Sequence, residues 1–357
     1  MSALLDPMTF RGGASSRNRI VLAAMTNGQS NDDGTLGEDE LRWLDMRAAG
    51  GFGIVTTCAA HVSKDGQGWA GELGIYDDRH VPGLKRLADL MHKRGALVFA
   101  QIFHGGLRAD KNLIGGLPWS ASAAEGICRA SDEQDIRRVI ADFAAAARRA
   151  REAGMDGVEI HGAHGYLITQ FLSTVENRRT DGWGGALEGR ARLAREVLRA
   201  ARDAAPAPFV VGMRLSPEDF GNAKGLDLDE NLQVARWLCE DGADFLHLSI
   251  WEALKNTAKR PDEHALTAFR RAVPDGVRLF AAGKIWTRSE GEKALALGAD
   301  AVALGRSAIA NPDWPLQVKD PRWSPRLPPL TKEELVARGL SPLFVEYMRR
   351  WKGFVAG

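Results

Sequence analysis

Short apolar runs alternate with longer segments of helical periodicity along most of this chain. The apolar runs predict strands at residues 19–25, 53–60, 96–103, 157–161, 209–215, 244–250, 277–282 and 301–304. Between them, apolar residues recur every three or four positions, which predicts helices at 38–49, 80–94, 131–153, 187–204, 228–241, 263–272 and 287–297. Strands that alternate with helices pair in parallel. Eight such strands favour an α/β fold with a single closed (β/α)8 TIM barrel over an open doubly wound sheet.

Two connections and the C-terminal tail depart from this regular pattern. The connections after the third and fourth strands, 105–130 and 162–186, are long and predicted to lack regular structure. Long loops of this kind are usually functional, and both fall on the carboxyl face of the barrel. Residues 312–329 are rich in Pro and Trp, and 331–339 and 342–351 are predicted to be helical. We therefore expect one domain over 1–357, with 312–357 as an extension packed on or beyond the barrel.

Composition narrows the class of partner. The formal net charge is +1, with 45% hydrophobic and 26% charged residues, as is ordinary for a globular protein. Nothing in this balance favours nucleic acid or an anionic membrane as a partner. Cys58, Cys128 and Cys239 lack metal or disulfide spacing, and the N-terminus shows no apolar run long enough for a signal peptide. These features lead us to expect a cytoplasmic protein with reduced thiols.

The densest group of chemically active side chains follows the fourth strand. His161, His164 and Tyr166 lie within six residues, where a barrel strand opens onto the site face. The histidines could be structural, could bind a ligand, or could hold zinc together with Glu159, which shares a strand face with His161. Tyr166 is either a proton donor or a residue that packs the loop. The other histidines considered, at 61, 80, 92 and 264, have the pattern of surface or helix residues and receive no role.

Other strand ends supply groups that suit a phosphorylated heterocycle. Gly283 and Gly305 make turns after the seventh and eighth strands, where barrels of this kind bind phosphate, and Arg306 adds a positive charge. The alternative is that the two glycines only make tight turns. The amide of Gln101 can both donate and accept hydrogen bonds at a ring edge. Arg214 on the fifth strand needs a partner, which is either a ligand or a carboxylate such as Glu159.

These segments together resemble the old yellow enzyme family of flavin-dependent ene reductases. The similarity runs from about Asn18 to about Pro315, and its most specific part is His161 to Gly185, including the run HGAHGY. It implies an FMN site and a set of residues that bind this cofactor, namely Ala24, Met25, Thr26, Ala59, Gln101, Arg214, Gly283, Gly305 and Arg306. It also implies that His161 and His164 bind the substrate carbonyl and that Tyr166 donates the proton, with no metal involved.

The resemblance implies an FMN-dependent oxidoreductase that uses NAD(P)H to reduce the C=C bond of α,β-unsaturated carbonyl compounds or similarly activated alkenes. Its expected partner is this small-molecule substrate, with neither nucleic acid nor membrane, and the chain is a possible homo-oligomer. Two alternatives stay open from the residues alone. One is a metal-dependent hydrolase on the same barrel, using His161, His164 and Glu159. The other is a flavoprotein NADH oxidase without an ene substrate.

Overall fold

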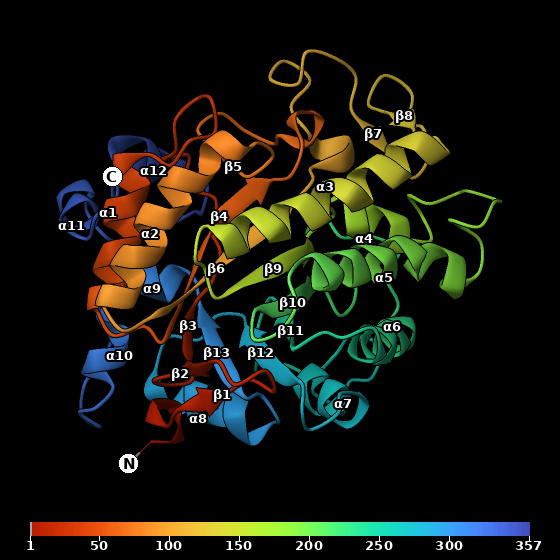
Figure 1. The fold of residues 1–357 in the computed structure, drawn as a ribbon. Coiled ribbons are helices and arrows are strands. Elements are labelled where there is room, and N and C mark those ends of the chain that lie inside the picture. Colours follow the sequence, from red (N-terminus) through yellow and green to blue (C-terminus); the bar gives the residue numbers. More distant parts are fainter. Residues whose placement is uncertain (1) are drawn as a thin grey trace.

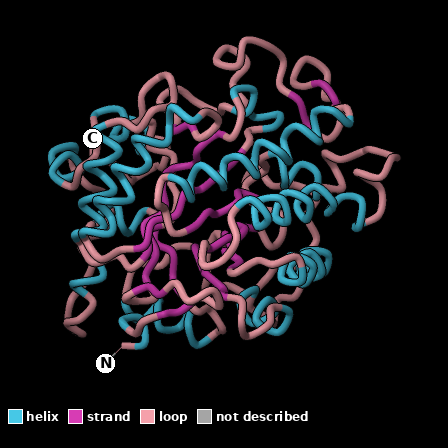
Figure 2. The backbone as a smooth tube through the Cα atoms, in the orientation of Figure 1, coloured by secondary structure: helices cyan, strands magenta, loops and turns pink. Residues whose placement is uncertain are grey.

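Eight parallel strands close into a barrel in the computed structural model, which describes residues 2–357 (Figures 1 and 2). The strands are β3 (Ile20–Leu22), β4 (Ile54–His61), β6 (Leu97–Phe103), β9 (Gly157–Gly162), β10 (Val210–Leu215), β11 (Phe245–Ser249), β12 (Arg278–Ala282) and β13 (Ala301–Leu304). They neighbour one another in the order β3-β13-β12-β11-β10-β9-β6-β4, and β4 pairs back with β3. The predicted TIM barrel is therefore confirmed.

Helices surround the strands in the order that the sequence pattern predicts. They are α1 (Glu38–Ala49), α2 (Val81–Lys93), α3 (Glu133–Glu152), α5 (Leu187–Ala204), α6 (Leu228–Glu240), α7 (Ala265–Ala272) and α8 (Arg288–Ala296). Capping residues fix where several of them begin. Asp132 caps α3 and Thr287 caps α8, each in a reciprocal pair with the residue three positions on. Such caps satisfy amides that the first turn of a helix leaves unpaired.

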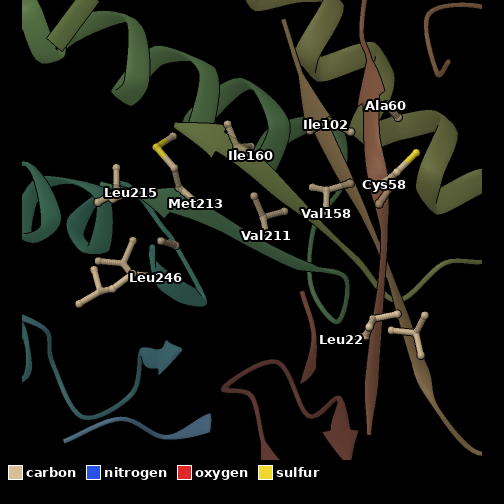
Figure 3. Close-up of a cluster of buried hydrophobic side chains, with 14 of the residues drawn as sticks. Leu22, Cys58, Ala60, Ile102, Val158, Ile160, Val211, Met213, Leu215 and Leu246 are labelled. Atoms are coloured by element: carbon tan, nitrogen blue, oxygen red, sulfur yellow. The ribbon is translucent and has the colours of Figure 1, made fainter. Parts of the chain in front are cut away.

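Successive side chains of each strand point alternately toward the surrounding helices and into the interior of the barrel. Val158 and Ile160 on β9 and Val211 and Met213 on β10 belong to the large apolar cluster that also contains the helix residues, and Figure 3 shows them side by side. The residues between them face the other way, because successive side chains of a strand point to opposite faces. Glu159 and His161 are thereby directed into the barrel.

Aromatic rings fill the end of the barrel that lies away from the strand carboxyl ends. Phe245 stacks on Phe280 with ring centroids 4.7 Å apart and on Phe99 at 5.6 Å. Phe10 packs against all three rings at 5.9 to 6.2 Å. It lies between β1 (Met8–Thr9) and β2 (Ser15–Ser16), an antiparallel pair near the N-terminus in Figure 1 that the sequence pattern did not predict. This cluster supports the polar layer above it.

Three connections differ from the sequence predictions. The first strand stops at Leu22 rather than at residue 25, because the next residues leave the ladder to line a cavity. The loop 162–186 is not irregular throughout: it contains the buried helix α4 (Leu167–Leu172). The loop 105–130 contains a short 3-10 turn, Gly106–Arg108, and the strand pair β7 (Trp119–Ser120) and β8 (Arg129–Ala130).

A buried arginine attaches the C-terminal segment to the barrel. After β13 come α9 (Arg306–Ala310), α10 (Trp314–Gln317), α11 (Lys332–Ala337) and α12 (Pro342–Met348). Arg47 on α1 donates to the carbonyl oxygen of Arg338, 2.6 Å away beyond α11, and to that of Ala308 in α9. Its guanidinium lies over the Trp43 ring, which also meets Phe344 of α12 at 5.1 Å. The tail is thus packed against α1.

The helices also bear on the question of a membrane. Within residues 2–357, none combines the length and the apolar composition that crossing a bilayer requires.

Gly212 offers a test of how tightly the barrel interior is packed. A Cβ at this position on β10 would overlap the Phe245 ring, so we expect Gly212→Ala to lower the free energy of unfolding by about 1–3 kcal/mol through overpacking. Urea unfolding of both proteins measures the difference. Gly276→Ala is the matched control, since a Cβ there meets no atom within 4 Å. Equal stability of the Gly212→Ala variant and the wild type would show that the aromatic cluster yields without cost.

Candidate active site

A cavity of about 350 Å³ opens at the carboxyl ends of the strands. All the residues that the sequence singled out as cofactor-binding, substrate-binding or catalytic lie on its wall: Ala24, Met25, Thr26, Ala59, Gln101, His161, His164, Tyr166, Arg214, Gly283, Gly305 and Arg306. They come from seven strands and from the loops that follow them. Their convergence follows from parallel pairing, which brings every strand carboxyl end to the same mouth.

The charges on the cavity wall all have one sign. Arg108, Arg214, Lys284 and Arg306 line the cavity, and its lining residues include neither Asp nor Glu. Alanine and methionine side chains supply much of the remaining wall near β3 and β4. The arrangement fits a flat, largely apolar ligand that carries negative charge and polar edges.

A buried carboxylate forms a polar layer beneath the cavity. One oxygen of Glu159 accepts a hydrogen bond from Gln101 Nε2 at 2.6 Å, and the other lies 2.6 Å from His247 Nδ1. Burial alone would raise the pKa of Glu159, but His247, Arg214 and Gln101 together bring it below its usual value. Burial lowers the pKa of His247, with Glu159 opposing. We therefore assign Glu159 as ionised and His247 as neutral, with His247 Nδ1–H donating a hydrogen bond to the carboxylate.

Arg214 is connected to the histidine pair through Ser249. Its Nη2 donates to Ser249 Oγ at 3.1 Å, and the same oxygen lies 2.6 Å from His164 Nε2. A second donor, Nη1, reaches the carbonyl oxygen of Ala24, whereas the buried Nε has no protein partner among the described residues. The alternative of an Arg214–Glu159 ion pair is wrong, because Glu159 contacts His247 instead. An unpaired donor on the wall points to a ligand as its acceptor.

The two histidines and Tyr166 form a compact group. The ring centroids of His161 and His164 are 4.9 Å apart and the rings are nearly perpendicular. The Tyr166 ring lies 5.1 Å from His161. His164 has a left-handed backbone with φ of +62°, an uncommon conformation for a non-glycine residue that the tight turn at the end of β9 imposes. His161 Nδ1 is buried without a protein partner among the described residues.

Protonation states in this group follow from burial. Burial, and after it His164 and Arg214, lower the pKa of His161 well below its usual value. Burial and Arg214 do the same for His164. Burial raises the pKa of Tyr166 to about 12, although Arg108 opposes the shift. At neutral pH the group therefore consists of two neutral imidazoles and a protonated phenol.

The opposite end of the cavity carries the two glycine turns. Gly283 has φ of +154°, and a Cβ there would overlap the carbonyl oxygen of Ile250, so the turn requires glycine. Arg306 follows Gly305 and opens α9, whose first amides have no partner inside the helix. Lys284 beside Gly283 pairs with Glu252 at 2.8 Å. Lys284 is thereby paired, so the turns offer backbone amides and the Arg306 guanidinium to one anionic group.

Several residues of the cavity wall were missed from the sequence. The C-terminal helix α12 and the residues after it contribute Phe344, Tyr347 and Trp351, and the loop after β4 contributes Trp69. The three aromatic residues recur at three and four positions, a spacing that places residues of a helix on one face, although α12 ends at Met348, before Trp351. This spacing indicates a buried face, but it does not identify the surface against which that face packs. Arg108 carried no signal beyond its place in a long loop.

Two predictions about the other polar groups are corrected. His61 is not a surface residue: it ends β4 and is 2% exposed. His80 is helical as predicted but equally buried.

The metal alternative loses its third ligand, since both oxygens of Glu159 are used by Gln101 and His247. Within residues 2–357 no group of three His, Cys, Asp or Glu side chains is placed to hold a metal ion.

Comparisons with known proteins identify the family of the chain. Residues 3–324 match the NADH:flavin oxidoreductase / NADH oxidase family. The chain is 37% identical over 331 residues to a probable NADH-dependent flavin oxidoreductase of Bacillus subtilis, a match that covers 89% of this chain and 88% of the relative.

Solved structures give the same result. The old yellow enzyme homologue from Zymomonas mobilis superposes with a TM-score of 0.83 at 28% identity, covering 96% of this chain and 99% of that one. Morphinone reductase superposes with a TM-score of 0.81 at 26% identity, covering 94% and 93%. Flavin chemistry thus replaces the hydrolase alternative. The chain belongs to the old yellow enzyme family of FMN-dependent oxidoreductases that use NADH or NADPH.

Proposed function

We propose that this oxidoreductase reduces the carbon–carbon double bond of α,β-unsaturated carbonyl compounds or similarly activated alkenes. The observation that carries the proposal is the convergence of His161, His164 and Tyr166 on the cavity that also holds the predicted cofactor residues. One structural relative is named morphinone reductase. A flavoprotein NADH oxidase without an ene substrate is the second candidate, because the family description includes NADH oxidases.

The residues present fit FMN. The unpaired donor of Arg214 suits the polar edge of a heterocycle, and Gln101 is held by Glu159 so that its carbonyl oxygen stays free to accept. Ala24, Met25, Thr26 and Ala59 form the wall beside it. Gly283, Gly305 and Arg306 would hold the phosphate at the other end. When bound, FMN supplies hydride transfer between NAD(P)H and the substrate.

His161 and His164 would polarise the substrate carbonyl. Arg214 can only donate hydrogen bonds, so Ser249 Oγ is the acceptor in the contact between these two residues. The hydroxyl proton of Ser249 is then free to be donated to His164 Nε2. The neutral His164 then carries its proton on Nδ1, where it can be donated to a ligand. Together with His161, this donor would stabilise negative charge that develops on the carbonyl oxygen, in the manner of an oxyanion hole.

Tyr166 would supply the proton to carbon. With a pKa of about 12, its phenol keeps its proton at neutral pH. The ring is held between Phe103, at 4.9 Å, and the guanidinium of Arg108, at 4.3 Å. A fixed, protonated phenol beside the carbonyl-binding pair has the features of a general acid.

We extend the proposal to the organisation and location of the protein. One FMN-binding domain over 1–357, with 312–357 as an extension, is supported by the contacts of Arg47 with the tail. A cytoplasmic location is supported by three free cysteines, Cys58, Cys128 and Cys239. Association into a homo-oligomer also stays a prediction.

The cofactor assignment predicts what denaturation releases. The supernatant of the unfolded protein should contain FMN, and Arg306→Ala should raise the Kd for FMN about tenfold or more, because a charge-assisted contact contributes about 1.5–3 kcal/mol. Titration of the FMN-free wild type and variant with FMN, followed by flavin fluorescence, gives the Kd of each protein. Arg322→Ala is the control, since Arg322 is exposed and pairs only locally with Asp320. Unchanged affinity in the Arg306 variant would exclude Arg306 as the phosphate ligand.

The neutral state of His161 predicts a pH dependence of stability. Below the ordinary histidine pKa of about 6.5, the unfolded chain takes up a proton at this position and the folded chain does not. This difference destabilises the folded state as the pH falls, so His161→Asn should reduce the loss between pH 7 and 5.5 by about 1 kcal/mol. Urea unfolding at both pH values measures it. Equal losses in the wild type and the His161 variant would mean that His161 titrates freely.

The role of Tyr166 is separated by half-reaction. Tyr166→Phe should slow reoxidation by an activated alkene about 10²–10⁴-fold and leave reduction by NAD(P)H nearly unchanged, since only the alkene step needs a proton on carbon. Stopped-flow absorbance follows each half. Tyr76→Phe, outside the cavity, should change neither. Equal loss in both halves would indicate a misplaced loop, and a wild type that is reoxidised by oxygen but by no alkene would favour the NADH oxidase.

A further inference from the structure

Arg108 is a cation of the cavity wall without an ionic partner. It ends the 3-10 turn that follows β6, and it is half-buried. Its Nη1 donates to the carbonyl oxygen of His164 at 2.7 Å, and its guanidinium lies over the Tyr166 ring. Among the described residues that line the cavity with Arg108, none is Asp or Glu. A guanidinium has five N–H donors, and Arg108, which also interacts with the Tyr166 hydroxyl, keeps further donors for a ligand in the cavity that it lines.

The predicted contacts of the cofactor do not use this charge. Gly283 and its turn follow β12, and in the closed barrel β12 is separated from β6 by three strands in either direction. Arg306 follows the adjacent strand β13. Arg108 therefore reaches the mouth from the side opposite β12, with two strands, β3 and β4, between β6 and β13. Lys284, by contrast, is neutralised by Glu252.

Glu176 is an acid on which the charge of Arg108 acts, and the two side chains form no ion pair. Burial raises the pKa of Glu176 to about 7, and Arg108 is the first group that opposes the shift. No contact between the two falls within salt-bridge distance, and Glu176 does not line the cavity. A half-buried cation next to a half-protonated acid still lacks its counter-charge. Desolvating a charge without a partner is costly, and a ligand anion would remove that cost.

We propose that Arg108 binds a carboxylate of the substrate, so that the enzyme selects α,β-unsaturated carbonyl compounds that also carry a free carboxylate. This inference rests on the proposed function. The planar fork of arginine matches a carboxylate in a bidentate pair. A carboxylate is favoured over a distant phosphate because Arg108 contacts the backbone of His164 and the ring of Tyr166. The anion must therefore lie within a few bonds of the polarised carbonyl.

The rival interpretation is that Arg108 only positions Tyr166. In that case its removal would affect charged and uncharged substrates equally. If Arg108 binds a carboxylate, its removal lowers turnover of the acid alone. The ratio of kcat/KM for an acid to that for its ester therefore distinguishes the two interpretations. Dividing the ratio of the variant by that of the wild type also cancels any difference in intrinsic reactivity between acid and ester.

The test uses the FMN-loaded enzyme with 4-oxopent-2-enoate and its methyl ester. Arg108→Gln should lower the acid-to-ester ratio of kcat/KM about tenfold to hundredfold, mainly through KM for the acid, because a charged hydrogen bond is lost. Arg108→Lys keeps the charge but not the fork, and should give a smaller loss. Lys284→Gln removes a different cation from the same wall and should change the ratio less than about threefold, since that lysine is already paired.

Binding gives a second readout. Saturated 4-oxopentanoate and its methyl ester are titrated into the same proteins and followed by the flavin absorption spectrum. Arg108→Gln should weaken binding of the acid and spare the ester. An unchanged ratio in both experiments, or an equal change with Lys284→Gln, overturns the assignment. If the wild type reduces neither alkene, the proposed function fails, but the titration still decides whether Arg108 binds the carboxylate.

Discussion

The active site depends on one buried carboxylate, Glu159, which joins strands on opposite sides of β10. It accepts from Gln101 on β6 and from His247 on β11, so the floor of the cavity is a single hydrogen-bonded layer. Because both oxygens are used, the amide of Gln101 has one orientation and His247 has one tautomer. The ionised state holds only while His247, Arg214 and Gln101 offset the cost of burial. An apolar side chain in place of Glu159 would not fix the orientation of Gln101 and His247, even if it packed equally well.

Strand register places this layer and everything above it. Gln101 is opposite Glu159, Glu159 opposite Gly212, and Arg214 opposite both His161 and His247. Residues two apart on a strand share a face, so the aromatic cluster, the polar layer and the cavity wall form successive levels inside the barrel. A shift by one residue would send these polar groups outward and the outer valines and isoleucines inward. Burial on both faces makes such a shift prohibitive.

The sequence was sufficient for the barrel and for the convergence of the site, but not for what covers it. Eight apolar runs define the strands, and parallel pairing alone brings His161, Gln101 and Gly283 to one mouth. Local patterns carry no information about contacts between distant segments, so the docking of Tyr347 and Trp351 on the cavity was not predictable. Likewise, α4 is buried on all sides and lacks the amphipathic period by which surface helices are found. His61 could not be placed because the end of β4 extends one residue beyond the apolar run.

The positive cavity links ligand binding to the stability of the fold. Arg108, Arg214 and Arg306 face one small space with no acidic side chain on its wall, and burial lowers the pKa of Arg214 and of Arg306. Mutual repulsion and desolvation of these cations oppose folding. An anionic ligand neutralises them only in the folded chain, so its binding energy adds directly to the free energy of unfolding. A ligand with one negative group at the glycine turns and, as proposed, a second at Arg108 would offset this cost at both ends of the cavity.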